Sequence, residues 1–181
     1  MAQWGDGVAP DSPAIQRAVD AAAAAGGRAR VRVRGGHRYR IGTIVLRGGI
    51  EFPLEADAEL TVSTNRQDYR GDGVIVATGA NDLRVTGTGR LDGHARDFVT
   101  RYDPEGEWWV PAEWRPKMFT LTDCTNLEIR DITIGQAPQW GLHLLGCRNV
   151  LVDHVTLNFG ASDSFPAITQ TRGGAEAKPS R

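Results

Sequence analysis

Three tryptophans lie close together between residues 97 and 117, where the sequence has no alternation of apolar and polar residues. Trp108, Trp109 and Trp114 are interspersed with prolines, and the whole chain has five tryptophans. A flat indole face can bind the apolar face of a sugar ring or the surface of another protein. It can equally pack inward and hold a loop against the body of the molecule. The segment is therefore a candidate binding surface, with a structural role as the alternative.

The side chains that most often bind metals are dispersed. The four histidines are His37, His94, His143 and His154. Each stands alone, without a second histidine or a cysteine at the spacing of a zinc site. We therefore predict no metal ion and no other cofactor, and we expect the histidines at the surface or in a cleft.

A repeat must position these residues, because residues 119–134 and 142–157 follow one pattern at a spacing of 23. The equivalent pairs are Phe119 and Leu142, Leu121 and Leu144, Cys124 and Cys147, Asn126 and Asn149, Leu127 and Val150, Ile129 and Val152, Ile132 and Val155, Thr133 and Thr156, and Ile134 and Leu157. A period in this range indicates a solenoid.

The kind of solenoid follows from the alternation of apolar residues within each repeat. In the first repeat the apolar positions change from odd to even numbers between Ile129 and Ile132. Successive side chains of a strand point to opposite faces, so this shift marks a corner at which the apolar side stays inward. Corners are predicted at residues 130–131 and 153–154. About three short β-branched strands per repeat, without a helix, favour an all-β parallel β-helix over a leucine-rich repeat.

The tryptophan segment interrupts this repeat. The pattern of Ile75, Leu83 and Val85 returns at Phe119, Leu127 and Ile129, which is 44 residues later rather than 23. One coil plus an insertion of about 21 residues explains this spacing better than two coils, because residues 97–117 lack the alternation of a strand. We therefore predict that residues 97–117 form a long loop that leaves the coil.

A capping helix is predicted ahead of the repeat. Ser12 and Pro13 precede an alanine-rich run that ends at Gly26 and Gly27, so Ser12 is the expected N-cap and residues 12–26 the expected helix. Such a helix covers the open end of the first coil of a β-solenoid. Residues 1–172 are then expected to form a single domain, followed by a disordered tail at residues 173–181.

Cys124 and Cys147 hold the same position in successive repeats. They should lie on neighbouring strands about 4.8 Å apart, a distance that permits a disulfide without requiring one. Free, buried thiols are the expectation, because free cysteine packs like a small apolar residue.

The composition excludes several classes of partner. The 181 residues carry a net charge of -1, so no overall field draws the chain to nucleic acid or to an anionic membrane. The alternating arginines at positions 28, 30, 32 and 34 are expected on a solvated outer face. The longest apolar run, residues 21–25, is too short to span a membrane, and the first residues do not form a secretion signal. As written, the chain is expected to be cytoplasmic.

Several segments together resemble the polygalacturonase-like glycoside hydrolases of family 28, which are right-handed parallel β-helices acting on pectic polysaccharides. The matching segments are GDGV (5–8), AIQRAVD (14–20), LEADAEL (54–60), GTGRLDG (87–93), WW (108–109), RP (115–116), WGLH (140–143) and CRNV (147–150). They cover nearly the whole chain up to Leu157. Members of this family are often secreted, which leaves the compartment of this protein open.

The resemblance implies an inverting hydrolysis of an α-linked galacturonan. One carboxylic acid protonates the leaving oxygen, and a second carboxylate activates water on the opposite face of the sugar. Family members carry an Asn-Thr-Asp-Gly motif, whose place is taken here by residues 162–165 (SDSF), so the resemblance implies a catalytic role for Asp163. The residues then expected to line the sugar cleft are Trp108, Trp109, Trp140 and His143.

The later motifs of the family, an Asp-Asp pair, Gly-His-Gly and Arg-x-Lys, would begin one repeat beyond Asp163, near residue 186 (163 plus 23), and the sequence stops at Arg181. We therefore expect the N-terminal half of such an enzyme, from a truncation or an interrupted gene, and no activity by itself. Pro166 departs from the family pattern, because proline removes a ladder donor. An acidic polysaccharide such as pectin, or an oligosaccharide, is the expected partner, and the uncapped last coil is expected to self-associate through its open edge.

Two other functions are compatible with the sequence. A carbohydrate-binding or spike-like β-helix would bind a pectic oligomer without turnover. A calcium-dependent, pectate-lyase-like enzyme on the same fold would need clustered acidic ligands, and Asp131, Asp153 and Asp163 are too scattered in the repeat to provide them.

Overall fold

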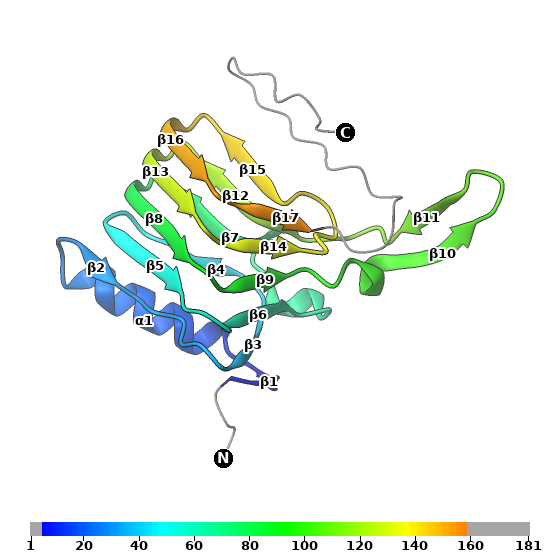
Figure 1. Cartoon of the computed structure of the whole chain (residues 1–181), viewed down its shortest axis with the longest axis horizontal. Helices are drawn as coiled ribbons and strands as arrows, with labels where there is room; N and C mark the ends of the chain where they lie inside the picture. Colours follow the sequence, from blue (N-terminus) through cyan, green and yellow to red (C-terminus); the bar gives the residue numbers. More distant parts are fainter. Residues whose placement is uncertain (1–4, 159–181) are drawn as a thin grey trace.

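The computed structural model of the protein describes residues 5–158, which form a right-handed parallel β-helix of three sheets (Figure 1). The four-stranded sheet consists of β4 (Ile44–Val45), β7 (Gly73–Thr78), β12 (Lys117–Thr122) and β15 (Leu142–Leu145). The five-stranded sheet consists of β2 (Ala29–Arg30), β5 (Ile50–Leu54), β8 (Asn81–Gly87), β13 (Thr125–Arg130) and β16 (Arg148–Asp153). The six-stranded sheet consists of β1 (Asp6–Pro10), β3 (Arg38–Ile41), β6 (Glu59–Val62), β9 (Arg90–Asp92), β14 (Thr133–Gly135) and β17 (Thr156–Asn158). From β4 onward the chain visits these sheets in this order on each coil.

The strand register confirms the repeat read from the sequence. Phe119 pairs with Leu142 in the four-stranded sheet, and Leu127 pairs with Val150 in the five-stranded sheet, both at a spacing of 23. Phe119 also pairs with Ile75, so the spacing of 44 spans a single coil with an insertion. The earlier coils differ in length, since Ile44 pairs with Ile75 at a spacing of 31.

Corners of the coil lie where the alternation of apolar residues shifts. Asp131 and His154 have φ angles of 64° and 49°, in the left-handed region that turns the chain between two strands. Asn126 and Asn149 occupy a second type of corner with φ angles of 56° and 51°. The Nδ2 of Asn149 donates to the Oδ1 of Asn126 (2.7 Å), and the Nδ2 of Asn126 donates to the Oδ1 of Asp82 (3.0 Å). Side chains from three successive rungs thus form a ladder of hydrogen bonds along these corners.

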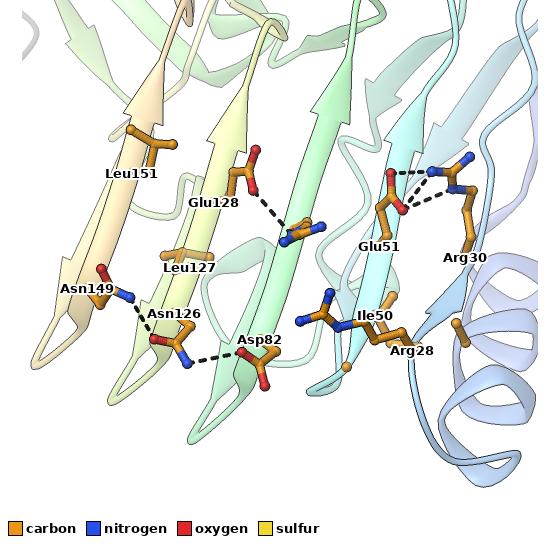
Figure 2. Close-up of a pocket in the computed structure, with 13 residues that line it drawn as sticks. Arg28, Arg30, Ile50, Glu51, Asp82, Asn126, Leu127, Glu128, Asn149 and Leu151 are labelled. Atoms are coloured by element: carbon orange, nitrogen blue, oxygen red, sulfur yellow. Dashed lines mark hydrogen bonds and ion pairs between the residues drawn. The ribbon is translucent and has the colours of Figure 1, made fainter.

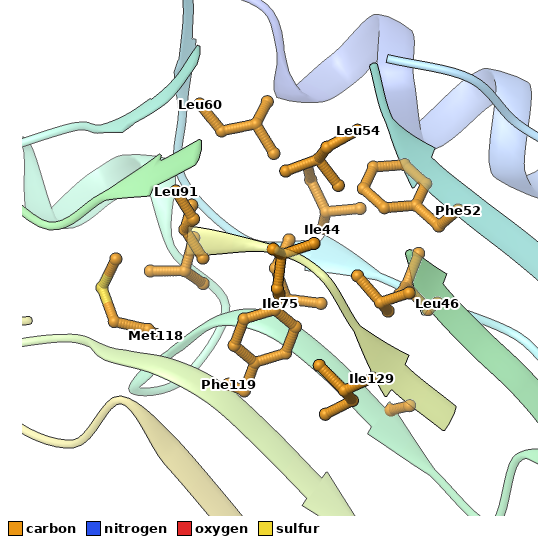
Figure 3. Close-up of a cluster of buried hydrophobic side chains, with 14 of the residues drawn as sticks. Ile44, Leu46, Phe52, Leu54, Leu60, Ile75, Leu91, Met118, Phe119 and Ile129 are labelled. Atoms are coloured by element: carbon orange, nitrogen blue, oxygen red, sulfur yellow. The ribbon is translucent and has the colours of Figure 1, made fainter. Parts of the chain in front are cut away.

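Inward side chains fill the space between the three sheets (Figure 3). Phe52 from the five-stranded sheet and Phe119 from the four-stranded sheet are completely or almost completely buried, as are Ile44, Ile75 and Leu91. Because identical positions stack on successive rungs, one alternating pattern builds one continuous core.

Cys124 and Cys147 are both free thiols within this stack. The Sγ of Cys124 lies 3.8 Å from the carbonyl oxygen of Ala77, and the Sγ of Cys147 lies 3.3 Å from that of Leu121. Burial raises the pKa of the Cys124 thiol, which keeps it protonated.

The helix α1 (Ser12–Ala24) contacts β2, β4 and β5 and covers the first coil (Figure 1). It ends two residues earlier than predicted, and its N-cap is Asp11 rather than Ser12. The hydroxyl of Ser12 instead accepts a hydrogen bond from the N–H of Gly42 (2.7 Å), because the start of the helix is packed against the turn after β3. Within residues 5–158 no helix is long and apolar enough to cross a membrane.

The insertion leaves the coil as predicted but is not an irregular loop. After the short 3-10 helix η2 (Ala95–Phe98), β10 (Val99–Asp103) and β11 (Trp108–Pro111) form an antiparallel hairpin that projects from the coil (Figure 1). A hairpin outside the core has no buried face, so it does not need the alternation by which strands are recognised in a sequence.

Trp114, which follows this hairpin, has the structural role that was the alternative for the three tryptophans. Its ring packs edge-on against Tyr69 (centroids 4.8 Å apart) and Phe98 (5.7 Å), and the guanidinium of Arg66 lies 5.0 Å from its centroid. Arg66 is the first residue of the 3-10 helix η1 (Arg66–Asp68) and Tyr69 follows it directly, so Trp114 packs the returning chain against the preceding coil.

Candidate functional site

On the outer face of the four-stranded sheet, one row of side chains changes from apolar to polar along the coil, whereas the next row runs from Thr78 and Thr122 to the exposed Leu145. The first row has Val45 next to Val76, Val76 next to Thr120, and Thr120 next to His143. The last two members can exchange hydrogen bonds with a ligand, whereas the first two cannot. In the row of Val45, Val76, Thr120 and His143, the side chains that can hydrogen-bond therefore lie on β12 and β15.

Trp140 and His143 come together at the start of β15. Their ring centroids are 4.4 Å apart at an interplanar angle of 82°. The backbone holds Trp140 in place, because its carbonyl oxygen accepts a hydrogen bond from the N–H of Met118 on the preceding rung (2.8 Å). Two of the residues predicted to line a sugar cleft are thus in direct contact.

Lys117 and Asp72 extend this pair toward the earlier coils. The Nζ of Lys117 lies 2.6 Å from the Oδ2 of Asp72 and 5.6 Å from the centroid of the Trp140 ring. The hydrogen bond from Lys117 lowers the pKa of the Asp72 carboxyl group, which is therefore a poor proton donor at neutral pH. The indole ring of Trp140 therefore has both an ammonium group and an imidazole ring as neighbours.

Two buried polar atoms beside this cluster have no hydrogen-bond partner: the Oγ1 of Thr120 and the Nδ1 of His143. Desolvation by burial, followed by the charge of Lys117, lowers the pKa of His143, so its ring is neutral at neutral pH and can both donate and accept. An unpartnered buried polar atom is costly unless water or a ligand satisfies it. A ligand hydroxyl that displaces the side chains covering these two atoms would give them a partner beside an aromatic ring.

Trp108 and Trp109 occupy the hairpin rather than this sheet. Their exposed fractions are 45% and 40%, large values for tryptophan. Trp109 packs edge-on against Tyr102 (5.3 Å), and the Nε1 of Trp108 donates to the Oδ2 of Asp103 (3.2 Å). The structure describes no contact between these two rings and Trp140 or His143, so their place in a shared cleft stays a prediction.

Asp163, the residue predicted to be catalytic, lies outside the described residues. Sequence reasoning also missed Lys117 and Asp72. A signal for Lys117 was available, because residue 117 lies one repeat of 23 before Trp140 and two before Asp163. The spacing of 44 places Gly73 opposite Lys117, so Asp72 lies one residue away from the position that the repeat indicates.

A separate hollow of about 460 Å³ lies on the outer face of the five-stranded sheet (Figure 2). The ion pairs Arg30–Glu51 (2.9 Å) and Arg84–Glu128 (3.2 Å) join four of its charged side chains, and Arg28 and Asp82 also line it. No unpartnered buried polar atom belongs to its lining, in contrast to the cluster around His143. Arg30 is well exposed, as expected for a solvated face, although the strand predicted there is reduced to the two residues of β2. We therefore place the functional site on the four-stranded sheet.

The remaining histidines have different surroundings. His37 lies near the ring of Tyr39 (6.0 Å), and the Nδ1 of His154 lies 2.9 Å from Asp153 at an exposed corner. His94, however, is not isolated. Its side chain lies close to two carboxyl groups from neighbouring strands of the six-stranded sheet.

Comparison with known proteins places this architecture among sugar hydrolases. The polygalacturonase QRT2 of Arabidopsis thaliana is 26% identical over 147 residues, which are 77% of this chain and 33% of that protein. A Parabacteroides merdae structure described as a glycosyl hydrolase superposes with a TM-score of 0.76 at 27% identity, covering 88% of this chain and 73% of the other. An exopolygalacturonase from Thermotoga maritima has the same fold, with a TM-score of 0.70 at 18% identity over 84% of this chain and 44% of its own.

The chain spans about a third of the length of the curated relatives that it matches. The family model for glycosyl hydrolases family 28 matches residues 29–173, which include every strand from β2 to β17. This match agrees with the parallel β-helix and with the motifs seen in the sequence. The chain belongs to glycosyl hydrolases family 28.

Proposed function

We propose that this protein serves the hydrolysis of an α-linked galacturonan, and that the outer face of β12 and β15 binds the sugar. The observation that carries this proposal is the contact between Trp140 and His143 beside two buried polar atoms without partners. Aromatic faces bind the apolar faces of sugars, and the unpartnered atoms suit sugar hydroxyls. The ammonium group of Lys117 adds a positive charge that suits an acidic sugar.

Asp163 is the proposed catalytic carboxyl group, on the basis of its place in the repeat. Lys117, Trp140 and Asp163 follow one another at spacings of 23. The first two already flank one site on adjacent rungs, and the same position on a further rung would bring Asp163 next to Trp140. The inverting reaction requires a second carboxyl group roughly 6.5 to 9.5 Å away, a separation that adjacent rungs can supply.

Pro166 is a weaker objection to this placement than the sequence suggested. In β5 the chain reads Phe52-Pro53-Leu54, with Phe52 and Leu54 inward and Pro53 outward. The carbonyl oxygen of Pro53 still accepts from the N–H of Val33 (2.9 Å). Residues 165–167 read FPA, with the proline again one position after a phenylalanine. A parallel coil of this protein therefore accommodates such a sequence.

We further propose that residues 1–181 bind the polysaccharide without turnover. The described carboxyl group in contact with the site is that of Asp72, and its lowered pKa disfavours a role as the general acid. Asp163 alone would leave one of the two roles unfilled. Release of reducing ends from polygalacturonate tests this directly. A rate above buffer that disappears in Asp163→Asn would overturn the inactivity and leave the substrate assignment standing.

The second candidate function is that the protein binds carbohydrate as its natural role and does not serve catalysis at all. The exposure of Trp108 and Trp109 favours it. Titration with galacturonan oligomers followed by tryptophan fluorescence distinguishes the surfaces. If β15 carries binding, Trp140→Ala weakens it by about tenfold, as expected for loss of an aromatic contact of 1 to 1.5 kcal/mol, and Trp109→Ala has little effect. The reverse result would move binding to the hairpin. A chain that binds none of a panel of acidic oligosaccharides contradicts both functions.

Self-association is a further part of the proposal. Val150 and Val152 on β16 point inward but are 37% and 43% exposed, because no described strand lies beyond them. An apolar surface beside a row of unpaired strand groups is a template for pairing with another chain. We propose that two copies of residues 1–181 meet at this open end.

A further inference from the structure

We propose that Glu59, Asp92 and His94 bind a divalent transition-metal ion, with Zn²⁺ as the representative, at the base of the hairpin insertion. One ligand atom from each residue lies within 4.8 Å of the other two. The site is independent of the sugar-binding cluster and goes beyond the proposed function. It also differs from the expectation drawn from the sequence, in which His94 stood alone.

Neighbouring rungs of the six-stranded sheet bring the ligands together. Glu59 on β6 and Asp92 on β9 lie on adjacent strands, and both point outward because Leu60 and Leu91 point into the core. His94 follows β9 by two residues, and its Nε2 lies 3.8 Å from the Oδ1 of Asp92. Ligands about 2.1 Å from a tetrahedral zinc ion are about 3.4 Å apart, so the side chains, now within 4.8 Å of one another, would draw together on binding.

Each ligand is oriented by a second residue. The Oδ2 of Asp92 accepts two hydrogen bonds from Arg90 (2.6 and 2.9 Å), and its Oδ1 accepts one from the backbone N–H of His94 (3.0 Å). The Nε of Arg38 lies 2.9 Å from the Oε2 of Glu59 and forms an ion pair with it. The Nδ1 of His94 lies 3.5 Å from Asp97, so its other nitrogen faces Asp92. In metal centres, the second nitrogen of a histidine ligand typically donates a hydrogen bond to a carboxylate, and carboxylate ligands typically accept hydrogen bonds from other residues.

Thr61 provides an independent indication of a ligand. It lies directly opposite Asp92 in the ladder between β6 and β9, so its side chain leaves the same face of the sheet. Thr61 is 91% buried, and its Oγ1 has no hydrogen-bond partner. Asp92 is also buried, with an exposed fraction of 5%. A metal ion with a coordinated water next to Asp92 would satisfy this hydroxyl, since buried polar atoms normally have partners.

Such an ion would stiffen the root of the hairpin. The N–H of Ala95, directly after His94, donates to the carbonyl oxygen of Gln136 (3.0 Å), and η2 and β10 follow at once. Binding by His94 would fasten this start of the insertion to two coils of the β-helix. The metal would thus fix the direction in which the hairpin carries Trp108 and Trp109.

Isothermal titration of the tag-free chain with Zn²⁺ tests the proposal. We expect one ion per chain, with at least about tenfold weaker binding in Glu59→Gln and in His94→Asn, because even indirect partners of a ligand contribute that much. Asparagine is chosen because His94 has a φ of 46°, which asparagine tolerates. Zn²⁺ should also raise the melting temperature of the wild type but not of these variants.

Two matched variants serve as controls. Glu51→Gln breaks an equivalent ion pair with Arg30 on the neighbouring sheet (2.9 Å), and His154→Asn replaces another histidine with a left-handed φ of 49°. Both should bind Zn²⁺ as the wild type does. Absence of a one-to-one complex in the wild type overturns the proposal. Unchanged binding in both Glu59→Gln and His94→Asn overturns it as well, since the ion would then be held elsewhere.

Discussion

The two ends of the described coil (residues 5–158) differ in which described residues lie beside the outermost strands. At the first coil, α1 packs against β2, β4 and β5, and its Val19 is completely buried. At the last rung, Val152 is 43% exposed, whereas Ile129 at the same position one rung earlier is 0% exposed. The same repeat pattern therefore produces a closed core or an open apolar surface according to its neighbour. In a solenoid, interfaces between adjacent coils supply much of the stability.

The largest expected effect concerns association at the open end. If two copies meet there, the apparent mass rises toward a dimer as concentration increases, and Val152→Asp restores a monomer because it places a charge on the shared apolar surface. Val8→Asp, a change at another exposed valine at the opposite end, should leave the dimer intact. Size-exclusion chromatography with light scattering measures both. A wild type that stays monomeric at all concentrations contradicts the association.

Truncation of inward side chains should show the same contrast in stability. Ile129→Ala is expected to lower the free energy of unfolding by about 2 to 5 kcal/mol, because it leaves a cavity in a closed core. Val152→Ala should cost about 1 kcal/mol or less, since that side chain is already partly in water. Urea unfolding at low protein concentration gives both values. Equal losses would mean that Val152 is covered in solution.

Substitutions of the two asparagines in the corner ladder should also lower the free energy of unfolding by different amounts. Asn126 has partners on both sides, Asn149 above and Asp82 below, whereas Asn149 donates to Asn126 alone among the described residues. Asn126→Gly should therefore cost about 1 kcal/mol and Asn149→Gly about half of that. Glycine is used because both corners have positive φ angles. Urea unfolding compares the two variants, and a larger loss from Asn149 would reverse the predicted order.

The smallest effect is the pH dependence of the ion pair beside β12. The pKa of Asp72 is lowered from its ordinary value of 3.8 by the hydrogen bond from Lys117. Between the folded and unfolded pKa values the unfolded chain binds more protons, so the contribution is complete above pH 3.8 and is lost as the pH falls through the folded pKa. It should stay below about 1 kcal/mol, since the Asp72 side chain is half exposed.

Urea unfolding of the wild type and of Asp72→Asn, repeated from pH 6 down to pH 2, measures this contribution. The difference between the two proteins should shrink below pH 3.8. Glu113→Gln, a change at an exposed residue without a described partner, controls for the general loss of negative charge. A difference that grows as the pH falls would contradict the assigned direction.

The candidate site was predictable only in part. Trp140 and His143 were expected to line one sugar cleft; their rings are in contact, and the shared role in binding sugar stays a prediction. Lys117 shares the repeat position of Trp140, so the sequence contained the information to find it. Asp72 and the group of Glu59, Asp92 and His94 could not be found in this way, because strand pairing across coils of unequal length brings them together.

The sequence by itself determined the parallel β-helix, its 23-residue spacing and the point at which an insertion leaves it. Alternation of apolar residues and shifts at the corners are local properties, and each coil packs mainly on its neighbours, so local patterns suffice for the fold. Tertiary structure alone decided that the insertion is a hairpin, that Asp11 rather than Ser12 caps α1, and that an acid from one coil meets a histidine from the next. These features depend on which outward side chains become neighbours, and alternation specifies only the inward ones.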